Sequence, residues 1–190
     1  MTSERTYHHG DLRRAVLTAA LDVIRTEGPG ALSLRDLARR AGVSHAAPAH
    51  HFRDRTGLLT AIATEGYERF ADALADAPDL RERGVRYVRF AVDHPAHFQV
   101  MFQPDLYRAD DPGLLAAKDR ASAELLAGVA AWSLAHGFAT LLLSGNLEAA
   151  VGTRDPEAVF RSVTELLFAS ADERLPDERP APGGPERSGA

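Results

Sequence analysis

The side chains best suited to chemistry lie between residues 32 and 55, and they suit hydrogen bonding to nucleic acid better than catalysis. An Arg side chain prefers the guanine edge, and an Ala methyl group suits the methyl group of thymine. Hydroxyl groups, positive charge and the N–H groups at helix starts bind phosphate. The candidate contacts are Arg35, His45, Ala46 and Ala47 for base edges, and Ser33, Ser44 and Arg55 for phosphate.

A helix-turn-helix is the element expected to position these groups. Ser33 is a good N-cap for a short first helix, and Gly42 tolerates the left-handed backbone needed where the chain reverses. Ser44 can cap the second helix, over residues 45–51, which would lie in the major groove. Pro48 lacks an N–H group, so we place it in the first turn of that helix. An ordinary helical hairpin is the alternative interpretation.

The histidines of this segment have two interpretations each. His50 is the better candidate for a DNA contact, whereas His51 either contacts DNA or packs beside Phe52. A metal site is not expected, because adjacent histidines point to different sides of a helix and the chain has no Cys. The sequence also lacks the GxSxG, GxxxxGK[ST] and HExxH motifs, and GxGxxG after a strand. We therefore expect no enzyme activity and no cofactor, with a small helical enzyme or carrier as the alternative.

The charge is distributed unevenly. The net charge is −5, but residues 1–70 carry ten Arg and eight acidic residues, while residues 71–190 carry a net −7. A weakly basic head on an acidic body suits a DNA partner, because phosphate responds to the local field. No apolar run approaches the ~20 residues of a membrane span, and the N-terminus lacks the apolar centre of a signal peptide. A cytoplasmic protein without membrane contact is expected.

Helical periodicity continues along nearly the whole chain, which predicts an all-α fold: a three-helix helix-turn-helix head and a helical-bundle domain. The first helix is expected to begin after an Asp11 cap, and residues 113–145 form either one helix or two that meet near Gly128. The expected division is an N-terminal arm at 1–9, a DNA-binding domain at 10–55, a connecting helix at 56–77, a ligand-binding and dimerisation domain at 78–172, and a disordered tail at 173–190.

These motifs together resemble the TetR family of bacterial transcriptional regulators. The resemblance is strong over residues 7–70, where SLRDLARRAGVS is followed by HHF, a charged cap and Leu-Leu. It is weaker at 94–102 and 130–145, which look like a regulatory domain named for its Trp, His and Gly. Two departures stand out: Pro48 and Ala49 replace a large apolar residue and a Tyr, and the connection before Trp132 is short. Loss of that Tyr should remove one phosphate contact.

The resemblance implies a homodimer that binds a near-palindromic double-stranded DNA operator and responds to a small-molecule effector. A ligand-responsive repressor is expected, with an activator or a ligand-independent regulator as alternatives. The aromatic and polar side chains of the second half either line a ligand cavity or form plain core; they are Tyr87, Phe90, His94, Phe98, Met101, Phe102, Tyr107, Trp132 and His136. The helix around Trp132 has two apolar faces, so a partner subunit or the monomer's own core must cover the second. The interface candidates are Leu134, Phe138, Leu141, Val159, Phe160, Val163 and Leu167.

Overall fold

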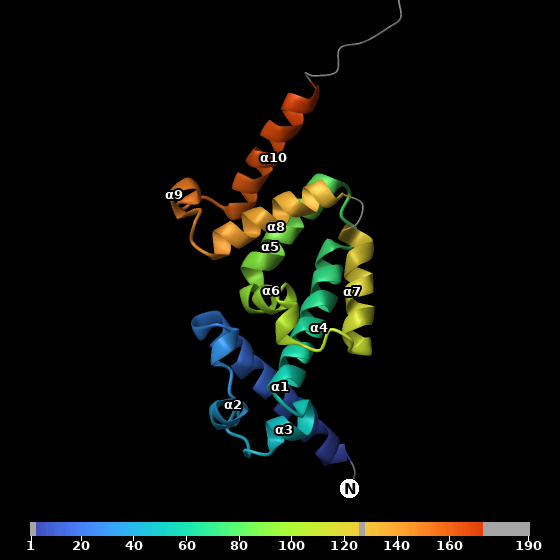
Figure 1. Ribbon diagram of the computed structural model, residues 1–190, viewed down its shortest axis with the longest axis vertical. Coiled ribbons are helices and arrows are strands. Elements are labelled where there is room, and N and C mark those ends of the chain that lie inside the picture. Colours follow the sequence, from blue (N-terminus) through green and yellow to red (C-terminus); the bar gives the residue numbers. More distant parts are fainter. Residues whose placement is uncertain (1–2, 126–127, 173–190) are drawn as a thin grey trace, which may run out of the picture.

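The chain is helical throughout the residues that the computed structural model describes, which are 3–125 and 128–172, with side chains described for 12–122 and 128–166. These residues contain no strand, which confirms the all-α prediction. The helices form a lower head, a long connecting helix and an upper group, with the last helix projecting from the top (Figure 1).

The head and the connecting helix together comprise the first four helices and a short 3-10 turn. They are α1 (Ser3–Glu27), η1 (Pro29–Ala31), α2 (Leu34–Arg40), α3 (Ala47–Phe52) and the long connecting helix α4 (Arg55–Leu74). The predicted helix start at Asp11 is wrong, because α1 begins at Ser3 and covers most of the expected arm. It ends at Glu27, because the next residue, Gly28, adopts a φ of 80° that other residues rarely take.

The upper group follows α4. It consists of α5 (Leu80–Asp93), α6 (Pro95–Met101), η2 (Pro104–Leu106), α7 (Pro112–Leu125), α8 (Val129–Leu143), α9 (Glu148–Val151) and α10 (Pro156–Asp172). The open question about residues 113–145 is resolved in favour of two helices, because α7 ends at Leu125 and Gly128 is the N-cap of α8. In Figure 1, α7 lies beside α4, while α8 crosses α5.

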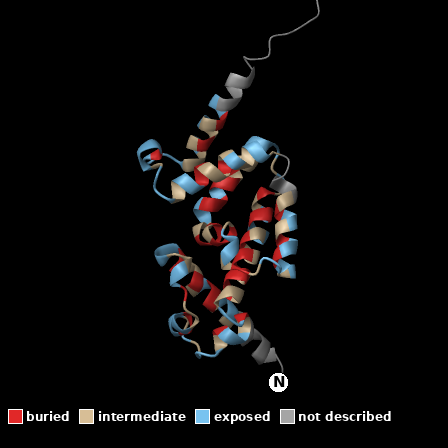
Figure 2. Ribbon diagram, viewed as in Figure 1, coloured by how far each residue is buried: buried red, intermediate tan, exposed pale blue. Residues whose placement is uncertain are grey.

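Two clusters of buried side chains hold these helices together (Figure 2). The lower cluster joins Val16 of α1 and Leu58 of α4 to Ala96 and Val100 of α6. The upper cluster is centred on Phe70, Tyr87, Phe90 and Phe160. Helix α4 contributes to both, and α6 does so too through Phe98 and Met101. The head therefore shares its core with a helix of the upper group.

No helix in the described ranges is both long and apolar enough to cross a membrane. The predicted disordered tail at 173–190 lies outside the described residues.

Candidate nucleic-acid interface and effector groove

Helices α2 and α3 meet at the turn that the sequence predicts. The Ser33 hydroxyl oxygen accepts a hydrogen bond from the Asp36 N–H at 3.5 Å, which confirms Ser33 as the N-cap of α2. Gly42 has a φ of 67°, and the Val43 N–H then donates to the Ala38 carbonyl at 3.0 Å. Ala38 is fully buried, so its small side chain allows the close approach of the crossing helices. The geometry is that of a helix-turn-helix.

The start of α3 differs from the prediction. Helix α3 begins at Ala47, and its N-cap is Ala46, so Ser44 does not cap it. Pro48 lies in the first turn, as predicted, and its missing N–H and fixed φ explain why the helix starts just before it. Ser44 is then too early in the chain to reach the helix N–H groups. Its carbonyl instead accepts the Ala47 N–H at 3.0 Å, forming the turn that leads into α3.

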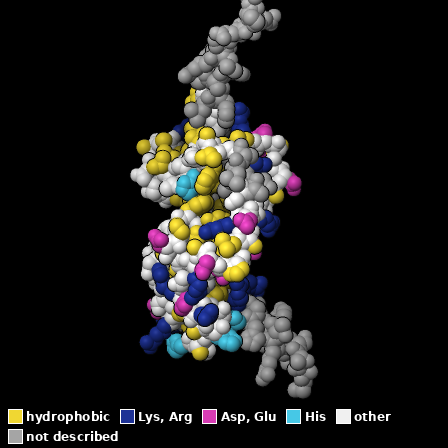
Figure 3. Space-filling model, turned by 45° about the vertical axis from the view of Figure 1, so that its right-hand side comes forward, with side chains coloured by type: hydrophobic (Ala, Val, Ile, Leu, Met, Phe, Trp, Pro, Cys, Tyr) yellow, Lys and Arg dark blue, Asp and Glu magenta, His cyan; other side chains and the backbone are white. Residues whose placement is uncertain are grey.

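Most of the predicted DNA contacts are exposed at the tip of the head. The exposed ones are Arg35, Ser44, His45, Ala46 and His50, whereas Ser33, Ala47, His51 and Arg55 are half-buried. In Figure 3, histidine side chains gather at this tip, with Lys and Arg side chains beside them. His51 lies against Phe52, with ring centroids 6.3 Å apart, and Phe52 is core. His50 thus keeps its place as the better candidate for a DNA contact.

Arg55 has a partner within the protein that the sequence did not indicate. Its guanidinium Nη2 donates to the Pro29 carbonyl at 2.6 Å, which ties the start of α4 to η1. Its contact with phosphate stays a prediction. Two exposed groups were missed, Ala49 on α3 and Arg53 directly after it. The exposure of Ala49 follows from the rotation of α3, which buries Pro48 and Phe52 on the opposite face.

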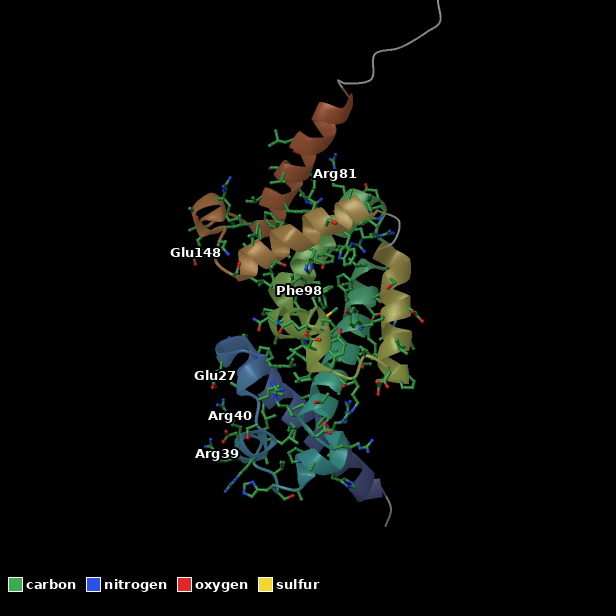
Figure 4. All side chains as sticks on the ribbon, viewed as in Figure 1. Glu27, Arg39, Arg40, Arg81, Phe98 and Glu148 are labelled. Carbon is green, nitrogen blue, oxygen red and sulfur yellow. The ribbon has the colours of Figure 1, made fainter. Side chains whose placement is uncertain are left out.

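Arg39 and Arg40 of α2 point outward from the head, as their labels in Figure 4 show. Arg39 pairs with Asp36 of the same helix at 3.1 Å. Arg40 pairs with Glu27 at the end of α1, also at 3.1 Å. Exposed pairs of this kind contribute little to folding stability. Each guanidinium group can therefore leave its carboxylate and contact an anionic partner.

A groove of about 360 Å³ separates the end of α6 from α8. It is lined by Phe98, Gln99, Phe102, Gln103, His136, Thr140, Leu143 and Ser144, none of which carries a charge when His136 is neutral. The rings of Phe102 and His136 lie 4.6 Å apart, and those of Phe98 and Phe102 lie 4.9 Å apart. Burial lowers the pKa of His136, which favours its neutral form. Its Nδ1 is hydrogen-bonded to the Tyr87 hydroxyl at 2.8 Å.

The predicted pocket residues therefore separate into two groups. Phe98, Phe102 and His136 line the groove, whereas Tyr87, Phe90, Met101 and Tyr107 are buried core. Two of the buried group have clear packing roles. The Met101 side chain fills the space over Gly66, and the Tyr107 hydroxyl donates to the Met101 carbonyl at 2.9 Å. For these four side chains the burial agrees with the plain-core alternative.

His94 and Trp132, the other two predicted pocket residues, do not line this groove. His94 lines a separate polar hollow beside α5, with Arg86 and Arg89. Trp132 borders a cavity of only about 20 Å³, between α5 and α8. Neither space is large enough and apolar enough to suit the ligand-cavity interpretation.

The predicted interface residues also separate by exposure. Phe160 is 1% exposed and stacks on Phe138 at 5.2 Å, so both belong to the monomer's own core. Gly84 of α5 makes this possible, because a Cβ there would lie 2.9 Å from the Phe160 ring. Leu141 is 45% exposed, while Leu134, Val159 and Val163 are half-buried. The side chain of Leu167 lies outside the described residues.

Comparisons with known proteins agree with this architecture. Residues 16–62 match the family model "Bacterial regulatory proteins, tetR family", and residues 80–167 match "Tetracyclin repressor-like, C-terminal domain". The chain belongs to the TetR family of transcriptional regulators. The first of these two matches includes the helix-turn-helix formed by α2 and α3.

The relatives show how far this likeness extends. The HTH-type transcriptional regulator BetI of Klebsiella pneumoniae (strain 342) is 37% identical over 62 residues, covering 33% of this chain and 32% of that protein. This chain thus matches about a third of the length of the curated relatives. A solved protein of unknown function from Rhodococcus sp. RHA1 is 31% identical with a TM-score of 0.65, covering 86% of this chain and 97% of that one. The putative regulatory protein SCO4313 shares the fold at 23% identity and a TM-score of 0.70, over 89% of this TetR-family chain and 100% of its own.

Proposed function

We propose that this TetR-family regulator is a homodimeric repressor that binds a near-palindromic operator and releases it when an effector occupies the groove between α6 and α8. The observation that carries the proposal is the double role of α6. Ala96 and Val100 face the core of the head, while Phe98 and Phe102 line the groove. A ligand that displaces α6 would therefore also displace the head.

The effector that fits this groove is a planar, uncharged aromatic molecule. The walls of the groove are aromatic rings and the Leu143 side chain, and a charged ligand would find no opposite charge among the lining residues. A volume of about 360 Å³ is at the small end of ligand pockets. The Nδ1 atom of His136 is occupied by Tyr87, so Nε2 is the ring nitrogen that a ligand can use.

The dimer is supported by apolar side chains on α8 and α10 that the monomer leaves exposed or only half-buried. Leu134 and Leu141 are seven residues apart on α8, and Val159, Val163 and Leu166 follow a helical stripe on α10. Leu166 is 73% exposed. Figure 3 shows hydrophobic side chains gathered over this upper part of the molecule. Two such helices from each subunit would form a four-helix interface.

Operator release gives a direct test of the effector groove. A panel of neutral bicyclic aromatics, with coumarin as the first probe, is titrated into the protein bound to an operator selected from random DNA. We expect at least one member to release the operator, and DNA to weaken the binding of that member by the same factor. Trp132, the single Trp, lies 6.3 Å from the His136 ring and supplies a fluorescence signal for binding.

A variant that fills the groove supplies the matched comparison. Thr140→Trp should abolish release while it leaves operator affinity unchanged, and Thr153→Trp, at an exposed position outside the groove, should change neither. Release should also weaken as the pH falls through the pKa of His136, which burial holds below its ordinary value of 6.5, because protonation would add charge to the groove. Release that persists in Thr140→Trp would place the effector elsewhere.

Base reading by α3 is tested separately. His50→Ala should alter the selected consensus at one or two positions in each half-site, each worth about 1–3 kcal/mol. Arg25→Gln removes an exposed positive charge at the far end of α1 and should leave the consensus unchanged. The two variants are compared by repeating the site selection. An unchanged consensus with His50→Ala would show that another exposed group, such as Ala49 or Arg35, reads the bases.

A further inference from the structure

The segment that joins α6 to α7 crosses α4 (Figure 1). The guanidinium Nη2 of Arg108 donates to Asp54 Oδ2 at 2.6 Å. The backbone N–H of Arg108 donates to Thr60 Oγ1 at 3.0 Å. Two hydrogen bonds from one residue of the upper group therefore fix it to the first turns of α4.

Asp54 stands at the junction between the reading helix and α4. Helix α3 ends at Phe52, Arg53 adopts a left-handed φ of 69°, and Asp54 then caps α4. Its Oδ1 accepts the Gly57 N–H at 2.7 Å, which leaves Oδ2 for Arg108. One carboxylate thus both starts α4 and receives the guanidinium of the upper group.

The surroundings keep this carboxylate ionised. The Gly57 N–H and the positive charges of Arg108 and Arg53 together hold the pKa of Asp54 below its ordinary value. Gly57 also provides the space, because a Cβ there would lie 2.8 Å from Arg108 Nη1. The hollow around the pair is lined by further charged groups from α1, α4 and the loop, namely Arg13, Glu65, Glu68 and Asp111.

The other end of the joining segment is fixed as well. The Met101 carbonyl, at the last residue of α6, accepts hydrogen bonds from the hydroxyls of Tyr67 at 2.8 Å and Tyr107 at 2.9 Å. Arg108 directly follows Tyr107. The residue before Arg108 is therefore tied to the end of α6, while the guanidinium of Arg108 contacts Asp54, which lies between α3 and α4.

We propose that Arg108 is a positioning residue for DNA reading, which holds the α3–α4 junction in its DNA-binding arrangement through Asp54. The proposal rests on the DNA-binding role of the family and does not depend on the effector groove. It contrasts with the ordinary interpretation, in which an exposed ion pair only adds a little stability.

The chain contains a matched control for that interpretation. Arg120 of α7 pairs with Asp72 of α4, so it also joins the upper group to α4 through a carboxylate. The two side chains of this pair are each more than half exposed. The pair lies more than four helical turns along α4 from the α3–α4 junction. Loss of this pair removes the same chemical contact without touching the start of α4.

The test compares Asp54→Asn, Arg108→Gln and Arg120→Gln in the full chain, with an operator selected by the wild type and a random-sequence duplex of the same length. Asn can still cap α4, and the substitution removes a negative charge near DNA. Electrostatics alone would therefore make Asp54→Asn bind more tightly. Positioning predicts the opposite.

We expect Asp54→Asn and Arg108→Gln each to weaken operator binding about five-fold for each head, hence roughly 25-fold for the dimer. The double variant should lose no more than either single variant, since both remove one contact. Arg120→Gln should bind normally, and all three should melt within a few degrees of the wild type. Equal or tighter operator binding by Asp54→Asn, or an equal loss in Arg120→Gln, would overturn the proposal.

Discussion

The Leu141→Asp, Leu166→Asp double variant is expected to sediment as a monomer and to bind its operator about 10³-fold or more weakly, close to its affinity for random DNA. These leucines are 45% and 73% exposed in the monomer, on α8 and α10. A carboxylate at each position would be buried against apolar surface in the dimer, which is costly without a partner. Neither side chain supports the monomer's core, so helical circular dichroism should be retained.

The control replaces two apolar residues of similar exposure on other helices. Leu115 of α7 and Val92 of α5 are 46% and 42% exposed, and Leu115→Asp with Val92→Asp should leave a dimer that binds DNA normally. A monomer in this control would show that apolar exposure alone does not locate the interface. A dimer that persists in the Leu141 and Leu166 variant would place the interface on other helices.

The second large effect is expected at Gly57. A Cβ at this position would lie 2.0 Å from the carbonyl oxygen of Phe52, which is backbone and cannot rotate away. Gly57→Ala must therefore move α3 relative to α4. We expect a loss of about 1–3 kcal/mol in the free energy of unfolding, as for other overpacked sites. Operator affinity should fall by more than this stability loss alone would cause, because the reading helix is displaced.

Gly30→Ala is the comparison within the same head. No atom lies within 4 Å of a Cβ built there, and the residue is exposed. Its unfolding free energy should stay within about 0.5 kcal/mol of the wild type. Both variants are measured by urea unfolding and by operator titration. Normal operator binding by Gly57→Ala would mean that the junction can shift without changing the reading face.

Local features of the head could be predicted from sequence because each depends on neighbouring residues. Ser33 caps the helix that follows it, Gly42 occurs where the backbone must turn left-handed, and Asp54 caps α4. The predicted capping of α3 by Ser44 was wrong for an equally local reason, because Pro48 determines where α3 starts. The chemistry of one turn of chain is sufficient to explain all four outcomes.

Contacts between distant segments could not be predicted in this way. The Arg108–Asp54 pair joins residues 54 positions apart, and no periodicity reveals it. The apolar stripe on α10 was predicted from the sequence, but which of its residues face the core was not. Phe160 turns into the core because Gly84 leaves space for its ring, while Leu166 remains outside. The same uncertainty in rotation left open whether Tyr87 and Phe90 line a cavity or form core, and both side chains are buried.

If two heads of a dimer read two halves of one operator, hydroxyl-radical footprinting of the wild-type protein on a selected operator should show both halves. We expect two protected stretches of inverted sequence whose centres are about one helical turn, ~10 base pairs, or a whole multiple of it apart. Binding should show one dimer for the pair of half-sites. A single protected half-site occupied by one chain, or two half-sites in direct repeat, would exclude this mode of binding.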